Sequence, residues 1–185
     1  MSPIASTEPP LCVDLDGTLV AADTLHRSIL LLARSRPWRL LELPFALLGG
    51  RARLKRRITD LALIDAASLP YRADVVDWVR AEKAAGRRVI LCTAADHRIA
   101  AAVAAHLGLF DGVVASDGSH NAKGIGKVEA IAAFLGGGEF DYVGDSVVDL
   151  PVLRAARHGV LVCPHPALER RARASCRIVR VFPRG

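Results

Sequence analysis

Aromatic residues are scarce in this chain: Phe, Trp and Tyr together make up 5% of its 185 residues. Ala, Val, Leu and Ile must therefore build the core, because hydrophobic residues still account for 51% of the sequence. This length and composition suit one folded domain with room for a small insertion. An aliphatic core of this kind is typical of a parallel sheet covered by helices.

Cysteine pairs, a secretion signal and long apolar runs are also lacking. No CxxC pair and no histidine at zinc-finger spacing occurs, so a zinc site is not expected. The chain's cysteines are expected to be small hydrophobes in a reducing cytosol, buried where they lie in apolar strand-like runs; they are Cys12, Cys92, Cys163 and Cys176. Residues 1–10 have neither the basic nor the apolar part of a signal and are expected to be a flexible lead-in. The longest apolar stretch, residues 40–48, is interrupted by Glu42 and Pro44 and is too short to span a membrane. These absences predict a cytoplasmic protein.

Positive charge exceeds negative charge, with a formal net charge of +6 and an isoelectric point of about 9.6. Such an excess favours anionic partners: a phosphorylated metabolite, a nucleic acid or an anionic membrane. It is equally compatible with an arginine-rich composition that has no specific role. A nucleic-acid site would have to use the basic residues 51–57 (RARLKRR), but no aromatic residues alternate with them, so nucleic acid is not expected.

Short apolar runs recur along the chain, with helical patterns between them. Runs that are apolar on both faces suit buried parallel strands, which we expect at residues 11–14, 88–92, 112–115, 140–143, 159–163 and 177–181. Helices are expected between them, at residues 73–85, 96–107, 127–135 and 149–157. Asp96 is a suitable N-cap, and Gly86 and Gly108 are suitable helix ends. The alternation predicts an α/β fold, a Rossmann-like parallel sheet with helices on both faces.

One segment, from about residue 24 to residue 70, breaks this alternation because it looks helical throughout. We expect a small helical cap at residues 23–70, inserted after the first strand, and a core of residues 11–22 and 71–182. Within the cap, the apolar residues 40–48 precede five cations at residues 51–57, a pattern that suits the surface of an anionic membrane. The simpler alternative is that the apolar residues pack inside the cap and the cations face water.

Two carboxylates lie where the first expected strand ends, in Asp14-Leu15-Asp16-Gly17-Thr18. Side chains two apart on a strand point to the same side. Buried carboxylates are costly unless they bind a cation or are well hydrogen-bonded. Since open α/β sheets bind ligands at the carboxyl ends of their strands, the pattern indicates a ligand site. The alternative is a polar strand end that caps a turn.

Polar residues also follow two later strands. Thr93 follows the second, where its hydroxyl and backbone N–H groups such as that of Ala94 suit a phosphate oxygen, although a helix cap would explain it as well. Asp145 follows the fourth strand in Tyr-Val-Gly-Asp. Asp149 comes four residues later and has the alternative role of a helix N-cap.

Two lysines lie at or just before the start of the helix expected at residues 127–135. The helix dipole disfavours a cation at this end, so such a lysine needs another reason, for instance an anionic substrate or a nearby carboxylate. Lys127 opens an amphipathic turn and is favoured. Lys123 is the alternative, and either one can be an ordinary surface lysine.

Together these motifs resemble the haloacid dehalogenase superfamily of phosphohydrolases. The matching residues are DLDGTLV at residues 14–20, Thr93, a lysine before a helix, and GDSVVD at residues 144–149. The resemblance implies that Asp14 attacks phosphorus and that Asp16 is the general acid and base. It also implies that Thr93 binds a phosphoryl oxygen and that the lysine neutralises charge.

The same resemblance implies a Mg²⁺ site. Its ligands would be Asp14, Asp145 and the backbone carbonyl of Asp16, which are the oxygen donors that this ion prefers. Asp149 would support these ligands, and Thr18 would steady the turn at Asp16.

Two groups within this superfamily are closer in pattern. Phosphoserine phosphatases share the insertion point of the cap. The chain is also similar to the phosphatase-like domain at the N-terminus of some bacterial membrane prenyltransferases of the ubiquinone-biosynthesis type, in LCTAAD, ASDG…NxKG and FDYVGDS. We therefore expect a Mg²⁺-dependent phosphate monoester hydrolase acting on a small or lipid-linked phosphorylated substrate, at the inner face of the membrane in the lipid-linked case. The alternative is a non-catalytic domain associated with a membrane prenyltransferase.

Overall fold

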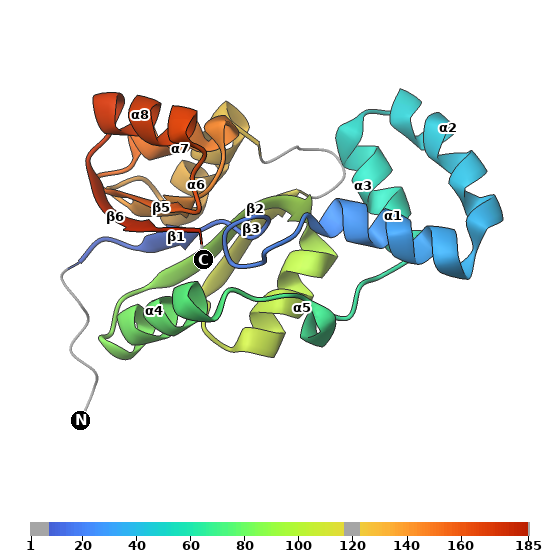
Figure 1. The fold of residues 1–185 in the computed structure, drawn as a ribbon, viewed down its shortest axis with the longest axis horizontal. Helices are drawn as coiled ribbons and strands as arrows, with labels where there is room; N and C mark the ends of the chain where they lie inside the picture. Colours follow the sequence, from blue (N-terminus) through green and yellow to red (C-terminus); the bar gives the residue numbers. More distant parts are fainter. Residues whose placement is uncertain (1–7, 117–122, 185) are drawn as a thin grey trace.

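The computed structural model describes residues 8–116 and 123–184; the side chains of residues 51 and 52 also lie outside the description. Its centre is a six-stranded, all-parallel sheet in the order β3-β2-β1-β4-β5-β6 (Figure 1). The strands are β1 (Leu11–Val13), β2 (Val89–Asp96), β3 (Gly112–Ser116), β4 (Asp141–Gly144), β5 (Gly159–Val162) and β6 (Ile178–Phe182). The predicted Rossmann-like parallel sheet is confirmed.

Helices cover both faces of the sheet. On one face lie α4 (Ala73–Ala84) and α5 (His97–Leu107); on the other lie α6 (Ile125–Leu135), α7 (Leu150–Ala155) and α8 (Pro166–Ser175) (Figure 1). Alternate residues of β1 serve the two faces: Leu11 and Val13 pack with α4 and α5, and Cys12 packs with α6, α7 and α8. This explains why the strand is apolar at every position.

Several predicted boundaries shift. β2 continues to Asp96, so Thr93 lies within the strand rather than after it, next to a register shift between Cys92 and Asp96. Helix α6 begins at Ile125, two residues before the predicted start, after Gly124 turns the chain with φ of 60°. Asp96 is the N-cap of α5, as predicted, and accepts a hydrogen bond from the Arg98 N–H at 3.0 Å.

Residues 24–68 contain only helices among the described elements: α1 (Thr24–Ser35), η1 (Pro37–Glu42), α2 (Leu43–Leu48), α3 (Arg51–Leu61) and the short η2 (Ala66–Ser68). Figure 1 shows α1, α2 and α3 projecting to one side of the sheet. The chain leaves and returns at one place, where the Ala21 N–H bonds the Pro70 carbonyl at 2.9 Å and Val20 pairs with Tyr71. Helices α1 to α3, which we call the cap helices, therefore follow β1 as an insertion.

The structure also bears on the expectations for the cysteines, for membrane-spanning helices and for the N-terminal residues. Cys12 and Cys92 are buried, but Cys163 and Cys176 are half-buried, because β5 ends at Val162 and Cys163 turns away with φ of 44°. No described helix has the length and apolar character that crossing a bilayer would require. Residues 1–7 of the expected flexible lead-in lie outside the described residues. The Pro9 carbonyl accepts a hydrogen bond from the Arg87 side chain, and the Pro10 carbonyl accepts one from the Asp141 backbone N–H.

Candidate active site

The strand order reverses at β1, and this is where the acidic residues gather. From β1 the chain passes outward to β2 and β3, and then returns to the other side of β1 to form β4. Asp14 follows β1 and Asp145 follows β4, so both lie at the point between two neighbouring strands whose connections run in opposite directions. Open α/β sheets bind their ligands at this point.

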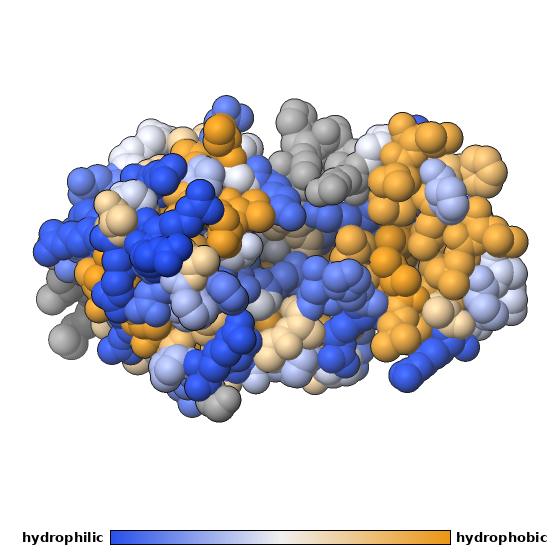
Figure 2. Space-filling model, turned by 45° about the horizontal axis from the view of Figure 1, so that its top comes forward, coloured by the Kyte–Doolittle hydropathy of each residue, from blue (hydrophilic) through white to orange (hydrophobic). Residues whose placement is uncertain are grey.

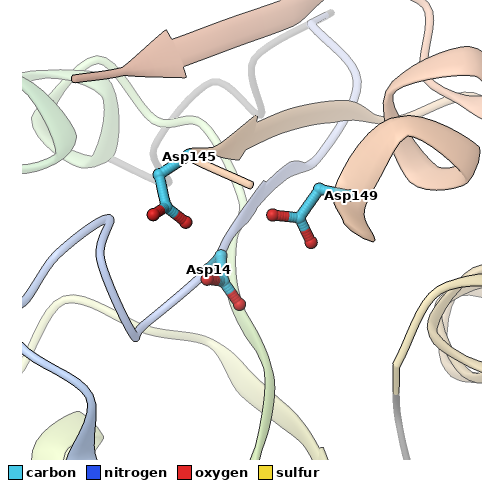
Figure 3. Close-up of side chains that lie close together, drawn as sticks. All are labelled: Asp14, Asp145 and Asp149. Carbon is cyan, nitrogen blue, oxygen red and sulfur yellow. The ribbon is translucent and has the colours of Figure 1, made fainter. Parts of the chain in front are cut away.

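Three of the predicted acids converge there. Among the described residues, carboxylate oxygens of Asp14, Asp145 and Asp149 lie within 4.8 Å of one another. Figure 3 shows the three side chains facing a common space from β1, from the end of β4 and from the turn that follows. The Asp16 carboxylate does not belong to this group, so any contribution of Asp16 to a metal would come from its backbone carbonyl, as the resemblance implied.

Lys127 lies inside this group of acids and only 3% of its side chain is exposed. Its Nζ donates to Asp14 Oδ1 at 2.7 Å, to the Tyr142 hydroxyl at 2.8 Å and to Asp149 Oδ1 at 3.2 Å. Lys123 is exposed and lines the cavity described below. Of the two candidate lysines, the structure brings Lys127 to the carboxylates.

Burial sets the proton affinities of these groups. Burial, together with the negative charges of Asp149 and Asp16, raises the pKa of Asp14 to about 8 against the opposing effect of Lys127. Burial and the charge of Asp149 raise the pKa of Asp145 to about 6. Burial alone would lower the pKa of Lys127, but the charges of Asp14 and Asp149 hold that pKa above its usual value. The cluster thus has more negative charge than one lysine can neutralise.

The geometry around Gly17 fits a cation among these carboxylates. Gly17 has φ of 79°, and a Cβ there would lie 2.1 Å from Asp145 Oδ2, so only glycine lets this carboxylate approach. Thr18 Oγ1 donates to Asp145 Oδ1 at 3.4 Å. An all-oxygen donor set with excess negative charge is what a hard divalent cation such as Mg²⁺ binds.

Thr18 and Asp149 have buried side chains that bond within the carboxylate cluster. The Thr18 hydroxyl donates to Asp145, and Thr18 does not line the cavity. The Asp149 side chain does not cap α7 but accepts from the Ser146 N–H at 3.3 Å and the Tyr142 hydroxyl at 3.0 Å. Both side chains orient the carboxylate cluster.

Asp16 faces the cap helices. Its Oδ1 accepts a hydrogen bond of 2.7 Å from the Thr24 N–H at the first turn of α1. Burial raises the pKa of Asp16, and the Thr24 N–H opposes that rise. Asp14 and Asp16 are thus two carboxylates with different surroundings, a pattern found where one is a nucleophile and the other an acid.

Thr93 and Ala94 complete the floor of the site. The Thr93 hydroxyl is buried and accepts from the Ala95 N–H at 3.0 Å. The Ala94 carbonyl accepts from Ser116 Oγ at 3.0 Å and from Lys55 Nζ of α3. Lys55 therefore joins the cap helices to the core directly beside Thr93.

A cavity of about 560 Å³ opens over these residues, between the core and the cap helices. Every predicted site residue except Thr18 lines it: Asp14, Asp16, Thr93, Ala94, Lys123, Lys127, Asp145 and Asp149. The cap helices contribute Leu25, Leu47, Leu54, Lys55 and Thr59 to its wall. The cavity thus has an anionic, lysine-containing floor and a partly apolar wall.

Two side chains of this site were not predicted from the sequence. Tyr142, fully buried, bonds Lys127 and Asp149, and its place in the motif before Gly144 could have suggested it. Lys55 belongs to the basic stretch that is expected to meet either a membrane surface or water, but it turns into the cavity, where burial and then the charge of Lys123 lower its pKa. No local pattern distinguishes Lys55 from its cationic neighbours.

Comparisons with known proteins agree with this fold. Residues 11–154 match the family model of haloacid dehalogenase-like hydrolases. Uncharacterized protein y4nM of Sinorhizobium fredii (strain NBRC 101917 / NGR234) is 39% identical over 153 residues, which cover 83% of this chain and 30% of that protein. This chain therefore spans less than a third of the length of that curated relative.

Solved structures share the fold at low sequence identity. A protein of unknown function from Bordetella pertussis Tohama I is similar with a TM-score of 0.73 at 22% identity, covering 94% of this chain and 99% of that one. A predicted phosphatase from Clostridium acetobutylicum has a TM-score of 0.67 at 14% identity, covering 96% and 94%. A phosphoserine phosphatase, solved as a phospho-aspartyl intermediate analogue, has a TM-score of 0.62 at 14% identity, covering 97% and 95%. Because the family model spans both acidic motifs and the buried lysine, the chain belongs to the haloacid dehalogenase-like hydrolases.

Proposed function

We propose that this protein hydrolyses phosphate monoesters in a Mg²⁺-dependent reaction that passes through an aspartyl-phosphate at Asp14. One observation carries the proposal: Asp14 is a buried carboxylate at the reversal point of the sheet, 2.7 Å from Lys127 Nζ, and it lines an open cavity. A buried carboxylate beside a cation at a ligand site suits nucleophilic catalysis. The similarity to a phosphoserine phosphatase fold supports it further.

The residues have distinct parts in this reaction. A carboxylate oxygen of Asp14 attacks phosphorus while the bond from phosphorus to the leaving oxygen breaks, and Asp16 gives that oxygen a proton. Asp16 then takes a proton from water, and the water oxygen attacks phosphorus and releases Asp14. Lys127 balances the charge of Asp14, and the Thr93 hydroxyl and the Ala94 N–H donate hydrogen bonds to phosphoryl oxygens.

Mg²⁺ would be held by Asp14, Asp145 and the backbone carbonyl of Asp16, with Asp149 supporting them. When bound, it would neutralise negative charge on the phosphoryl group and keep Asp14 ionised. The pKa of about 8 for Asp14 supports this need, since the carboxyl would retain its proton near neutral pH even with Lys127 beside it.

We infer the substrate class from the apolar side chains in the cavity wall. Leu25, Leu47 and Leu54 offer apolar contacts beside the ionic floor, so a leaving group with an apolar part fits, as in a lipid-linked phosphate. A small phosphorylated metabolite is the other substrate that the same floor would accept.

A second candidate function is a non-catalytic domain associated with a membrane prenyltransferase. The observation that favours it is the match to 30% of a longer relative, which leaves most of that relative outside this chain. Asp14, Asp16 and Lys127 argue against it, because a site without activity has no need for all three.

A panel of phosphate monoesters with Mg²⁺, including phosphorylated sugars and prenyl-phosphate sugars, tests the proposal. We expect turnover that EDTA removes and that Asp14→Asn lowers below detection. Asp77→Asn, which changes an exposed carboxylate on α4, is the matched control and should keep full activity. Beryllium fluoride should bind as a phosphoryl mimic and protect the native chain, but not Asp14→Asn, against thermal unfolding. Full activity in Asp14→Asn would rule out the covalent route.

A further inference from the structure

The cap helices expose an unusual number of large apolar side chains. Trp38, Leu41, Phe45 and Leu48 are 64%, 75%, 75% and 87% exposed. Together with Leu30, Leu31 and Leu47 they form a surface that we call the cap patch. Figure 2 shows apolar side chains gathered over the end of the molecule where Figure 1 places α1 and α2. This corrects the simpler expectation that these residues pack inside the cap, and exposed patches of this kind mark interaction sites.

Positive charge is concentrated in the same helices. Residues 24–61 contain nine Lys and Arg residues but only two acids, Glu42 and Asp60, a net charge of +7 in a chain whose total is +6. Both acids are already paired, Glu42 with Arg39 and Arg57, and Asp60 with Arg98. Among the described residues, five exposed arginines form no ion pair with an acid: Arg27, Arg34, Arg36, Arg53 and Arg56.

Apolar and cationic side chains also lie side by side. A groove of about 710 Å³ between α2 and α3 is lined by Phe45 and Ala46, by three arginines and by the two paired acids: Arg53, Arg56, Arg57, Glu42 and Asp60. Arg53 packs over Gly49, where an added Cβ would lie 2.3 Å from its Cδ. The groove therefore offers guanidinium groups directly beside an exposed aromatic ring.

These observations decide between possible occupants of the patch. A second copy of this chain in a symmetric dimer would place +7 against +7, which opposes association. An anionic lipid surface meets both features, because Trp, Phe and Leu enter the boundary between headgroups and acyl chains while cations bind lipid phosphates. We propose that the cap patch docks the protein onto the surface of an anionic membrane.

The cap patch adjoins the cavity that contains Asp14. Leu47 belongs to both: it is 51% exposed in the patch and it lines the cavity over Asp14. Docking would bring the cavity close to the bilayer, so a phosphate monoester with an apolar tail could reach Asp14 from the lipid. Only this last consequence rests on the proposed hydrolase function.

Flotation with lipid vesicles tests the docking. We expect the chain to float with vesicles of phosphatidylcholine and phosphatidylglycerol at low salt, to dissociate as salt rises, and to bind vesicles of phosphatidylcholine alone much less. Replacing Arg34, Arg36, Arg53 and Arg56 by Gln should weaken binding on the order of 10³-fold. The control replaces four exposed arginines outside the cap helices, Arg154, Arg170, Arg171 and Arg177, and should bind at least ten times more tightly than the cap variant.

Two further measurements test the apolar side chains of the cap patch. In a Trp78→Phe background Trp38 is the only tryptophan left, and its fluorescence should shift to the blue when anionic vesicles are added. The triple change Trp38→Ser, Phe45→Ser and Leu48→Ser should abolish flotation while circular dichroism stays native, because these side chains are exposed. Asp14→Asn should float like the native chain, which separates docking from catalysis.

Three outcomes would overturn the proposal. The first is no flotation with anionic vesicles at low salt. The second is flotation that the arginine control reduces as much as the cap variant does. The third is a dimer in solution that the triple serine variant dissociates, since the patch would then be a protein interface.

Discussion

Asp14 and Asp16 are two residues apart, but they have different hydrogen-bond partners. Asp14 bonds Lys127, whereas Asp16 bonds the Thr24 N–H and faces the cap helices. If Asp16 protonates the leaving group, Asp16→Asn should lower kcat by about 10²–10⁴-fold and leave KM nearly unchanged. Steady-state kinetics on the best substrate of the panel would measure both constants. A rise in KM alone would instead make Asp16 a binding residue.

Lys127 is buried and Lys123 is exposed, so replacing each by Ala should change activity to a different extent. Lys127→Ala should remove nearly all activity, because Asp14 and Asp149 lose a partner at 2.7 and 3.2 Å. Lys123→Ala is the matched control, since Lys123 is exposed at the edge of the same cavity, and it should lower activity less. Breaking a buried ion pair also costs about 3 kcal/mol of stability. Activity should therefore be compared at a temperature where circular dichroism shows both variants folded; the opposite order of activities would transfer the role to Lys123.

At the scale of elements, an ion-pair network joins the strands at the end opposite the site. Arg87, just before β2, bonds the Asp141 carboxylate at the start of β4 and the Pro9 carbonyl just before β1. Burial alone would raise the pKa of Asp141, but hydrogen bonds from Arg157 and Arg87 outweigh it and hold that pKa below its usual value. The network stabilises β1, β2 and β4 at the ends of these strands that lie opposite the site.

This network predicts a pH-dependent stability. A carboxyl whose pKa is lower in the folded chain contributes stability that is complete above its unfolded pKa of about 3.9 and is lost as pH falls through the folded value. Asp141→Asn should therefore cost about 3 kcal/mol at pH 7, and its Tm should approach that of the native chain below pH 4. Thermal unfolding between pH 3 and 7 would measure this. Asp77→Asn, an exposed carboxylate paired with Arg80, should change Tm little at any pH.

At the scale of the whole molecule, the cavity lies between two parts that few polar contacts join. Lys55 reaches the Ala94 carbonyl, Arg98 bonds Asp60, and Asp16 bonds the first turn of α1. These contacts join the cap helices to the core beside the cavity, so in the proposed function the position of the cap helices would decide which leaving groups enter. The division into a core and a cap at residues 23–70 remains our proposal for how the chain is organised.

Binding of Mg²⁺ should be visible in the stability of the whole chain. Burial and the negative charge of Asp149 raise the pKa values of Asp14 and Asp145, so both carboxylates are repelled by Asp149 when ionised. A cation that binds only the folded chain should stabilise it by about 2.7 kcal/mol at a concentration one hundred times its Kd. We expect Mg²⁺ to raise Tm at pH 7.5 and to have almost no effect on Asp145→Asn. Without Mg²⁺, Asp145→Asn should be at least as stable as the native chain, because one of the repelling charges is gone. An equal rise of Tm in both would place the cation elsewhere.

Much of the fold and the site followed from local sequence. The apolar runs predicted six strands within a few residues of their observed bounds, because a strand buried on both faces must be apolar throughout. The resemblance implied that Asp14, Thr93 and Asp145 serve one site, and in the structure they belong to the carboxyl ends of three neighbouring parallel strands. The extension of β2 through Thr93 was missed, because pairing with β3 continues past a register shift that leaves no local signal.

The sequence by itself determined the order of strands and helices, the helical segment after β1 and the acidic ends of β1 and β4, since each depends on the pattern of neighbouring residues. Only the tertiary structure decided that Lys127 rather than Lys123 reaches Asp14, that Lys55 leaves its basic stretch to enter the cavity, and that Phe45 and Leu48 remain exposed. These outcomes depend on how helices rotate and pack against elements distant in sequence. A helix presents every direction in turn, and the packing of the fold selects which of its side chains meet the site and which meet solvent.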